Sequence, residues 1–579
     1  MAPPTIKQII YRTFTRNHSL TLKVDAVRYL EDLVEEGETP PDQVEGVLEK
    51  IVTAYRKQDV DAAVIVDRAT LEKAVNSLSV IHAPIDTPFA RNLENGDTDA
   101  MEEDVDAVTA EQQLDVTRHF HVIDAFSMPK WRYTYDQKSF VRVTEDPKLL
   151  ASAAAKGDVH RARFDMLRQR ILRNENFCPP AFQTTDRDSY LKITAIKALL
   201  GREGEQFLLF GMLTQLQEGK VHLEDTDGNI ELDLSACKTG TGLYTDNCFV
   251  LAEGTYTDGD VFRVDEMGLP PPERRSVTSS AFGHLDFLGT PGPIVDETIL
   301  EQEEKANSDI AFVIISDVWL DQPKTMSSLR TIFEGYADAL VPLAFFLIGN
   351  FVSKPFLYSG TDSIKYKGQY EQIGKLRGVC HLEKMVRYSF NALADLILEF
   401  PTLATYSYFV FVPGSHDPWS GNTLPRPPIP DFFTGKLRNK VKKVCFTSNP
   451  CRVKYCTQEI VIFRDDILGK LRRNTLIPPN LEDEEEDITK HLIRTILDEG
   501  HLCPLPMHIR PIFWAYDHAL RLYPMPHVLV LADRCENYGV TYEGSHCINP
   551  GSFPNSDFTW SIYYPATRRS ERCALPPPR

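Results

Sequence analysis

Four hydrophobic stretches in the second half of the chain each end in a short polar segment. They read AFVIISD, LAFFLIGN, YFVFVPGSHD and HVLVLAD, and they end at Asp317, Asn350, Asp417 and Asp533. Short uninterrupted hydrophobic runs of this kind are typical of strands buried on both faces of a sheet. We therefore predict four buried strands whose polar corners hold the candidate functional residues.

Hydrophobic residues at helical spacing mark the first 80 residues. In residues 40–58 they occupy one face of a predicted helix: Val44, Val47, Leu48, Ile51, Val52 and Tyr55. The same spacing recurs in an earlier segment and in a later one: Val27, Leu30 and Val34, then Leu71, Val75 and Leu78. The pattern predicts a small N-terminal helical bundle over residues 1–80.

Closely spaced hydrophobic segments between residues 186 and 275 predict short strands. Glycine and Asp-Gly turns separate them, and Thr226–Asn229 is typical of a β-hairpin turn. Five or six strands in about 80 residues indicate an OB-type β-barrel. Its aromatic residues either fill the core or form a platform for single-stranded nucleic acid: Phe207, Phe210, Tyr244, Phe249, Tyr256 and Phe262.

Residues 118–185 form a connector with an aromatic segment and a helix predicted over 158–173. From residue 281 to 565 strands alternate with helical stretches such as 381–399 and 488–498, the α/β pattern. We expect the last segment, residues 566–579, to be a frayed tail. The fold class predicted is multidomain α+β.

Composition adds the class of protein. At 579 residues the chain is too long for one core. No run of about 18 apolar residues predicts a membrane span, and the N-terminus lacks the features of a signal peptide. Eleven irregularly spaced cysteines favour reduced thiols in the cytosol or nucleus.

Acidic residues are concentrated in one segment of the chain and also outnumber the basic residues overall. Residues 92–115 hold nine acidic residues and neither Lys nor Arg, which predicts a flexible acidic linker over 81–117. The whole chain has a formal net charge of −19. Because neutralisation of phosphates by basic residues supplies most nucleic-acid affinity, this charge argues against tight, autonomous DNA binding.

The four corners resemble those of calcineurin-like metallophosphoesterases, whose α/β sandwich holds two metal ions. In that family the first corner supplies an Asp and then a His, but here Trp319 stands two residues after Asp317. An indole N–H has no lone pair to give a metal. At the second corner Asn350 replaces the carboxylate that bridges the two ions.

The third and fourth corners also depart from the family pattern. Ser415 replaces an Asn ligand, although His416 and Asp417 are kept. Asp533 and Cys535 stand where two histidines are expected, and Arg534 between them adds positive charge. The resemblance therefore implies an inactive domain over 281–565, without catalytic residues, metal or other cofactor. We expect Asp317, Asn350, Ser415, His416 and Asp417 to form a hydrogen-bonded cluster.

The order of helical domain, acidic linker, barrel and altered phosphoesterase domain resembles the B-family accessory subunits of eukaryotic replicative DNA polymerases. The similarity is greatest to the epsilon branch, which has the N-terminal helices. The segments that carry it are TRHFHVIDAF (117–126), FGHLDFLG (282–289), IISDVWLD (314–321), FLIGNFVSKPF (346–356), FVPGSHDPW (411–419) and FTSNPCRVKYCTQEIVIFRDD (446–466).

The resemblance implies a non-catalytic scaffold in the nucleus. Its barrel and phosphoesterase domains would hold the zinc-bearing C-terminal region of the polymerase epsilon catalytic subunit. Residues 1–80 would bind the replicative helicase through GINS, with other small polymerase subunits nearby. The protein would contact DNA only within the assembly, and it would bind no membrane. Two alternatives remain: a divergent metal-dependent phosphoesterase and a single-stranded DNA binder.

Overall fold

The protein is described here from a computed structural model, which places residues 116–178, 190–217, 219–291, 295–356, 369–479 and 487–575, with short stretches between residues 10 and 71. The chain divides into two units. One contains residues 1–118 with the short segments 284–286 and 291–303, and the other contains the remainder. No helix in the described ranges is long and apolar enough to cross a membrane.

In the first unit, the described stretches contain helical residues and one short parallel strand pair. Residues 26–30 are helical, and Val27 and Leu30 are buried as the sequence pattern predicts. The strands β1 (Thr21–Leu22) and β2 (Ile65–Val66) pair in parallel, a feature that the predicted bundle did not include. Most of that bundle and residues 81–115 of the predicted acidic linker lie outside the described residues.

The second unit contains a β-barrel. Its strands are β6 (Ile193–Thr194), β7 (Gln206–Gln217), β8 (Lys220–Glu224), β9 (Asn229–Asp233), β10 (Lys238–Thr239), β11 (Phe249–Thr257) and β12 (Val261–Gly268). They pair in the order β10-β12-β11-β7-β8-β9, and β12 also pairs with β9, so the sheet closes on itself. The predicted hairpin is confirmed, because β8 and β9 flank residues 225–228.

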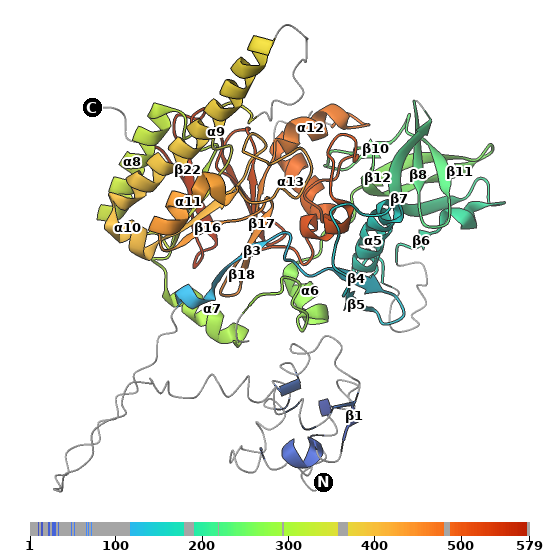
Figure 1. The fold of residues 1–579 in the computed structure, drawn as a ribbon. Helices are drawn as coiled ribbons and strands as arrows, with labels where there is room; N and C mark the ends of the chain where they lie inside the picture. The colour runs from blue at the N-terminus through green and yellow to red at the C-terminus, as the bar shows by residue number, and fades with distance from the viewer. Residues whose placement is uncertain are drawn as a thin grey trace, which may run out of the picture. The chain divides into compact units, whose positions relative to one another are not determined.

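A connector precedes the barrel and lies against it (Figure 1). It contains the hairpin β4 (Trp131–Thr134) and β5 (Ser139–Arg142) and the helix α5 (Ala154–Ile171). The predicted helix over 158–173 is therefore confirmed with its start four residues earlier. Phe164 of α5 packs on Phe210 of β7, with ring centroids 5.0 Å apart.

The rest of the second unit contains two six-stranded sheets. The first has the order β16-β15-β14-β13-β22-β23. Its strands are β13 (Phe312–Ser316), β14 (Ala344–Ile348), β15 (Tyr408–Val412), β16 (Val444–Phe446), β22 (Trp560–Tyr564) and β23 (Arg569–Cys573). Strands β13 to β16 are parallel, as buried hydrophobic runs predict, whereas β22 and β23 are antiparallel.

The second sheet has the order β20-β21-β19-β18-β17-β3. Its strands are β3 (Phe120–Asp124), β17 (Cys451–Tyr455), β18 (Gln458–Arg464), β19 (Val528–Ala532), β20 (Tyr538–Tyr542) and β21 (Ser545–Asn549). Its edge strand β3 comes from the connector, so the barrel is inserted between two paired strands of one sheet.

The two sheets pack face to face through aromatic side chains. Phe120 of the second sheet lies 5.9 Å from Phe312 and 4.7 Å from Tyr408 of the first, measured between ring centroids. Phe312 also contacts Tyr455 at 5.3 Å. The interface is thus a layer of interlocking rings between the sheets.

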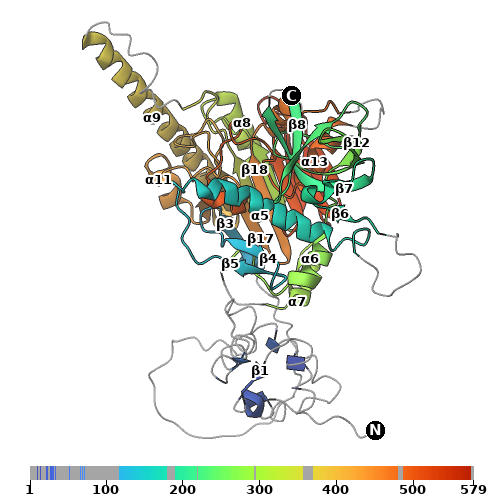
Figure 2. The same ribbon diagram turned by 90° about the vertical axis from the view of Figure 1, so that its right-hand side faces the viewer.

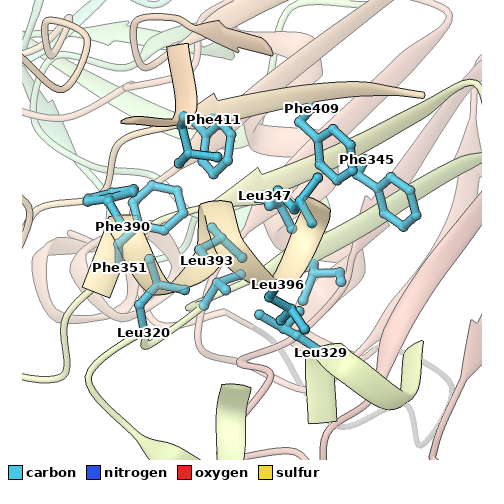
Figure 3. Packing of buried hydrophobic residues seen from close by; sticks show 14 of the residues in the cluster. Leu320, Leu329, Phe345, Leu347, Phe351, Phe390, Leu393, Leu396, Phe409 and Phe411 are labelled. Carbon is cyan, nitrogen blue, oxygen red and sulfur yellow. The ribbon is translucent and has the colours of Figure 1, made fainter. Parts of the chain in front are cut away.

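Helices cover the outer face of each sheet (Figures 1 and 2). On the first sheet they are α8 (Pro323–Asp338), α9 (Gln369–Leu398), α10 (Pro401–Tyr406) and α11 (Asp431–Lys440). Phe345, Leu347, Phe409 and Phe411 of the sheet meet the α9 side chains at this layer (Figure 3). On the second sheet, α12 (Ile467–Asn474) and α13 (Ile488–Asp498) bury their apolar faces. Helix α6 (Arg275–Phe282) follows the barrel in the chain. Helix α7 (Glu297–Ala306) precedes β13, and its residues up to Glu303 belong to the first unit.

One prediction about the C-terminal end was wrong. Residues 569–573 form β23, paired along its length with β22, and are not a frayed tail. The segment ATRRSER, which leads into and forms most of this strand, is polar and short of hydrophobic residues, so the sequence pattern concealed a strand at the edge of the sheet. Only residues 576–579 of the predicted tail lie outside the described residues.

Candidate functional site

The four predicted corners follow β13, β14, β15 and β19, as the hydrophobic runs indicated. The first corner is Asp317, a buried residue with a φ of 56°. This left-handed conformation is uncommon for any residue with a side chain, and Asp and Asn adopt it more readily than most. It turns the chain sharply as it leaves β13.

Asp317 and Asn350 join the first two corners. The backbone N–H and the side-chain amide of Asn350 both donate to Asp317 Oδ1, each at 3.1 Å. The amide oxygen of Asn350 in turn accepts from the backbone N–H of His416 at 2.8 Å. Asn350 therefore links the first corner to the third.

Asp417 holds the second and third corners together through backbone groups. Its carboxylate accepts from the N–H of Phe351 at 2.6 Å and from the N–H of Gly414 at 2.7 Å. Complete burial raises the pKa of Asp417 to about 7, although these two hydrogen bonds favour the charged form.

Two glycines allow this close approach. A Cβ on Gly349 would collide with the Asp417 carboxylate and the Gly414 backbone, and one on Gly414 would collide with Asn350. The glycines of LIGN and PGSHD are thus required by packing between corners, not by their own backbone angles.

A buried arginine, Arg464 at the end of β18, reaches the same place from the second sheet. Its Nη2 and Nε atoms donate to Asp317 Oδ1 at 2.8 and 3.2 Å, and Nε also donates to the Gly349 carbonyl at 3.0 Å. Its Nη1 donates to Asp466 Oδ1 at 2.7 Å and to the Ala532 carbonyl at 3.2 Å.

The charge of Arg464 controls the state of Asp317. Burial by itself would raise the pKa of Asp317, but the adjacent guanidinium and its hydrogen bonds outweigh burial, so that the pKa is lowered. Burial likewise opposes the charged form of Arg464, and the carboxylates of Asp317 and Asp466 raise its pKa in spite of it. The two groups form a buried ion pair.

The fourth corner is closed by the backbone and by Asn549. Asp533 Oδ2 accepts from the Leu468 N–H at 2.9 Å, at the start of α12. Cys535 Sγ accepts from the Asn549 amide at 3.0 Å. Arg534 points away from this interior: its side chain is 45% exposed, and its Nε lies 3.4 Å from Asp466 Oδ2.

The remaining two predicted residues take part differently. Trp319 is half-buried, and its backbone N–H donates to the Asp317 carbonyl at 2.8 Å. Ser415 is exposed, and its carbonyl accepts from Ser420 Oγ at 3.1 Å. The expected cluster is built from the side chains of Asp317, Asn350 and Asp417 and the backbone N–H of His416, whereas Ser415 bonds to Ser420 through its carbonyl.

The structure shows whether the aromatic residues of the barrel fill its core or form a platform for single-stranded nucleic acid. Phe207, Phe210, Tyr244, Phe249, Tyr256 and Phe262 are all buried. They form the barrel core and its contact with α5, and no stacking platform is made from them. The core interpretation is confirmed for these six residues.

Family models match three parts of the chain. DNA polymerases epsilon N terminal matches residues 2–78, the DNA polymerase epsilon subunit 2-like OB-fold domain matches 153–271, and the B subunit of DNA polymerases alpha and epsilon matches 312–540. DNA polymerase epsilon subunit 2 of Bos taurus is 36% identical over an alignment of 585 positions that covers 99% of each chain. The chain belongs to the family of DNA polymerase epsilon B subunits.

Other members of the polymerase epsilon B family match over most of their length. The B subunit from Schizosaccharomyces pombe is 33% identical over 98% of this chain and 95% of its own. That of Saccharomyces cerevisiae is 31% identical over 79% and 75%. A solved archaeal phosphodiesterase covers 46% of this chain at 11% identity, and its TM-score of 0.24 is too low to support an argument about the fold.

The corner residues of this polymerase epsilon B-family chain do not fit a two-metal centre. In the described part of the chain, no group of three or more His, Cys, Asp or Glu residues is placed to hold a metal ion. The Oδ1 atom of Asp317 already accepts from Asn350 and Arg464. A second cation beside that guanidinium would meet repulsion of like charge.

Sequence reasoning missed Arg464. Its signal was present in the segment VIFRDD, where a hydrophobic strand ends in Arg rather than in an acid. The sequence analysis assigned the positive charge at the corners to Arg534. In the structure the buried guanidinium is that of Arg464, because the sequence alone does not show which of the two arginines points into the interior.

Proposed function

We propose that this chain is a non-catalytic accessory subunit of DNA polymerase epsilon that acts in chromosomal DNA replication in the nucleus. The full-length match to polymerase epsilon B subunits carries this proposal. The corner geometry supports it, since the polar side chains of a calcineurin-like phosphoesterase site are replaced or bonded to one another. On this proposal the two-sheet domain is an inactive phosphoesterase sandwich whose metal ligands have been lost.

A rigid body formed by the barrel and the sandwich suits a scaffold. Buried hydrogen bonds join them: Thr245 Oγ1 donates to the Pro504 carbonyl at 2.7 Å, and the Leu476 N–H donates to the Tyr244 carbonyl at 2.7 Å. The Arg163–Asp517 ion pair fixes α5 to the sandwich, with Nη2 and Oδ1 2.6 Å apart. Such a body offers a large fixed surface to a permanent partner.

The proposed partner of that body is the zinc-bearing C-terminal region of the polymerase epsilon catalytic subunit, with other small polymerase subunits in the same assembly. Residues 1–80 would bind GINS on the replicative helicase. The acidic segment between them would act as a tether, which raises the effective concentration of the second binding site.

Pull-down from nuclear extract tests this division of labour. Full-length protein is compared with a variant lacking residues 1–80. We expect both to retain the catalytic subunit and only the full-length protein to retain GINS. Loss of both partners, or of neither, on deletion would refute the proposal.

A divergent phosphoesterase makes the opposite prediction about metal. The proposal expects less than one equivalent of transition metal per chain and no manganese-dependent hydrolysis of bis(p-nitrophenyl) phosphate. Two equivalents of metal, with hydrolysis that Asp417→Ala abolishes, would establish an enzyme instead.

A further inference from the structure

The Arg464 guanidinium donates hydrogen bonds to oxygen atoms at the ends of four strands. Its three guanidinium nitrogens donate to Asp317 after β13, to the Gly349 carbonyl after β14, to Asp466 after β18, and to the Ala532 carbonyl at the end of β19. The side chain is 2% exposed. A single cation therefore binds the carboxyl ends of strands from both sheets.

The bonding pattern of this guanidinium is that of a hard cation in an oxygen site. Divalent ions of the magnesium and manganese type are held by carboxylate and carbonyl oxygens that converge from several chain segments. Arginine can replace such an ion because its planar head carries a permanent charge and five donors in a fixed arrangement.

Charge balance at the corners supports the replacement. The central carboxylate, Asp317, is neutralised by Arg464, and Asp466 contacts both Arg464 and Arg534. Two carboxylates thus face two guanidinium groups. The two oxygens of Asp417 accept from the backbone N–H groups of Phe351 and Gly414.

We propose that Arg464 is the resident cation of the corner site: its guanidinium takes the structural place of a divalent ion, and its removal leaves a site for an exogenous cation. This inference rests on the proposed function, since it presupposes a phosphoesterase sandwich that has lost its metals. In this role Arg464 holds the corner segments of the two sheets in fixed positions relative to one another.

Cation rescue of Arg464→Ala tests the inference. Removing one member of a buried ion pair leaves an uncompensated charge, so we expect the unfolding midpoint of the full-length chain to fall by about 3–5 °C. Guanidinium chloride at about 10 mM should restore most of this loss by binding the folded state. Urea has nearly the same shape without the charge and should restore none. Manganese chloride should also stabilise the variant.

A matched control comes from a second buried arginine. Arg510 lies in a neighbouring network, where its Nη1 donates to Asn422 Oδ1 at 2.6 Å and its Nε lies 3.0 Å from Asp465 Oδ2. Arg510→Ala removes as large a buried guanidinium from a place that the inference does not assign to a divalent ion. We expect manganese to leave Arg510→Ala unchanged, and both salts to leave the wild-type midpoint unchanged.

The outcomes separate the two proposals. Equal effects of guanidinium and urea on Arg464→Ala would overturn the resident-cation role, and so would rescue by guanidinium without any effect of manganese. If the variant does not accumulate as folded protein, the same comparison is made on refolding yield in each additive. Stoichiometric manganese bound by the wild-type chain would instead overturn the proposed loss of metal.

Discussion

At the scale of single residues, the corner carboxylates act as hydrogen-bond acceptors for backbone N–H groups. Asp417 accepts two such groups, and Asp533 accepts the N–H of Leu468 and, at 2.6 Å, that of Arg534. Loops that leave buried strands have peptide groups without strand partners, and an unpaired buried N–H is costly. Acidic side chains at these corners therefore stabilise the conformation of the loops that follow the strands.

Alanine at the corner glycines should destabilise the fold. Gly349→Ala and Gly414→Ala each force a Cβ into a neighbouring corner, and overpacking of this kind costs about 1–3 kcal/mol or more. Gly335→Ala in α8 is the control, because its Cβ would meet no atom within 4 Å and Ala is favoured in a helix by about 1 kcal/mol. Urea denaturation measures all three. Equal stability of Gly349→Ala and Gly335→Ala would contradict the collision.

Asp417 should make stability depend on pH. Its pKa in the folded state, about 7, lies above the unfolded-state value because burial disfavours the charge. Its favourable contribution is therefore complete below about pH 4 and is lost as the pH rises through about 7. Relative to Asp417→Asn, the wild type should lose on the order of 3 kcal/mol across this range.

The measurement is the free energy of unfolding at steps from pH 4 to pH 8. Burial also raises the pKa values of Asp498, to about 7, and Glu499, to about 8, but both are present in each protein and cancel in the difference. Parallel pH profiles for the wild type and Asp417→Asn would show that Asp417 does not change charge in this window.

At the scale of elements, α13 joins the barrel to the sandwich through a row of acceptors. His491, Thr495 and Glu499 are spaced four residues apart and so lie on one helix face. They accept from the backbone N–H groups of Gly242 at 3.0 Å, Leu243 at 2.8 Å and Phe249 at 3.0 Å. The opposite face of α13 packs on the second sheet. One helix thus serves both domains.

Thr495→Val should loosen this joint while keeping its shape. The buried Leu243 N–H would lose its acceptor, which costs about 1–3 kcal/mol. Hydrogen exchange should become faster at residues 242–249 and stay unchanged in the first sheet. Thr331→Val, at an exposed position of α8, is the control, and equal exchange in both variants would argue against the role of α13.

Much of this arrangement followed from the sequence, for physical reasons that differ by element. Strands β13, β14, β15 and β19 were predictable because burial on both faces requires unbroken hydrophobic runs. The hairpin at Thr226–Asn229 was predictable because its turn is chemically specific. Strand β23 was missed because only one edge of it pairs and its exposed residues are charged.

Pairings across long stretches of chain could not be predicted. Nothing local in TRHFHVIDAF indicates that β3 pairs with β17, since register is set by the partner strand and the shared core. For the same reason the ion pair between Arg464 and Asp317 was hidden: it depends on how two sheets stack, which no periodicity records. The corner residues could be found from the sequence, and their central counter-charge could not.

At the scale of the molecule, the C-terminal end completes the first sheet. Ending the chain after Thr567 removes β23 and turns β22 into an open edge that carries Trp560 and Tyr563. Open, apolar edges invite pairing between molecules. We expect a lower unfolding midpoint and self-association in light scattering, whereas ending the chain after Leu575 should change neither. A monodisperse, stable product of the longer truncation would show that β23 is dispensable.

The interleaved order of strands has a consequence for synthesis. Strand β3 can pair only after β17 has been synthesised, more than 300 residues later. One edge of β13 likewise stays unpaired until β22 has been made. When synthesis has reached residue 450, the first sheet has its four parallel strands but lacks β22 and β23, and the second sheet has only β3, whereas all strands of the barrel are made. Such nascent chains are prone to aggregate, and contacts of high sequence separation form slowly. Production of this protein should accordingly depend on chaperones until its last strands emerge, and we expect any partner of the sandwich to bind after translation is complete.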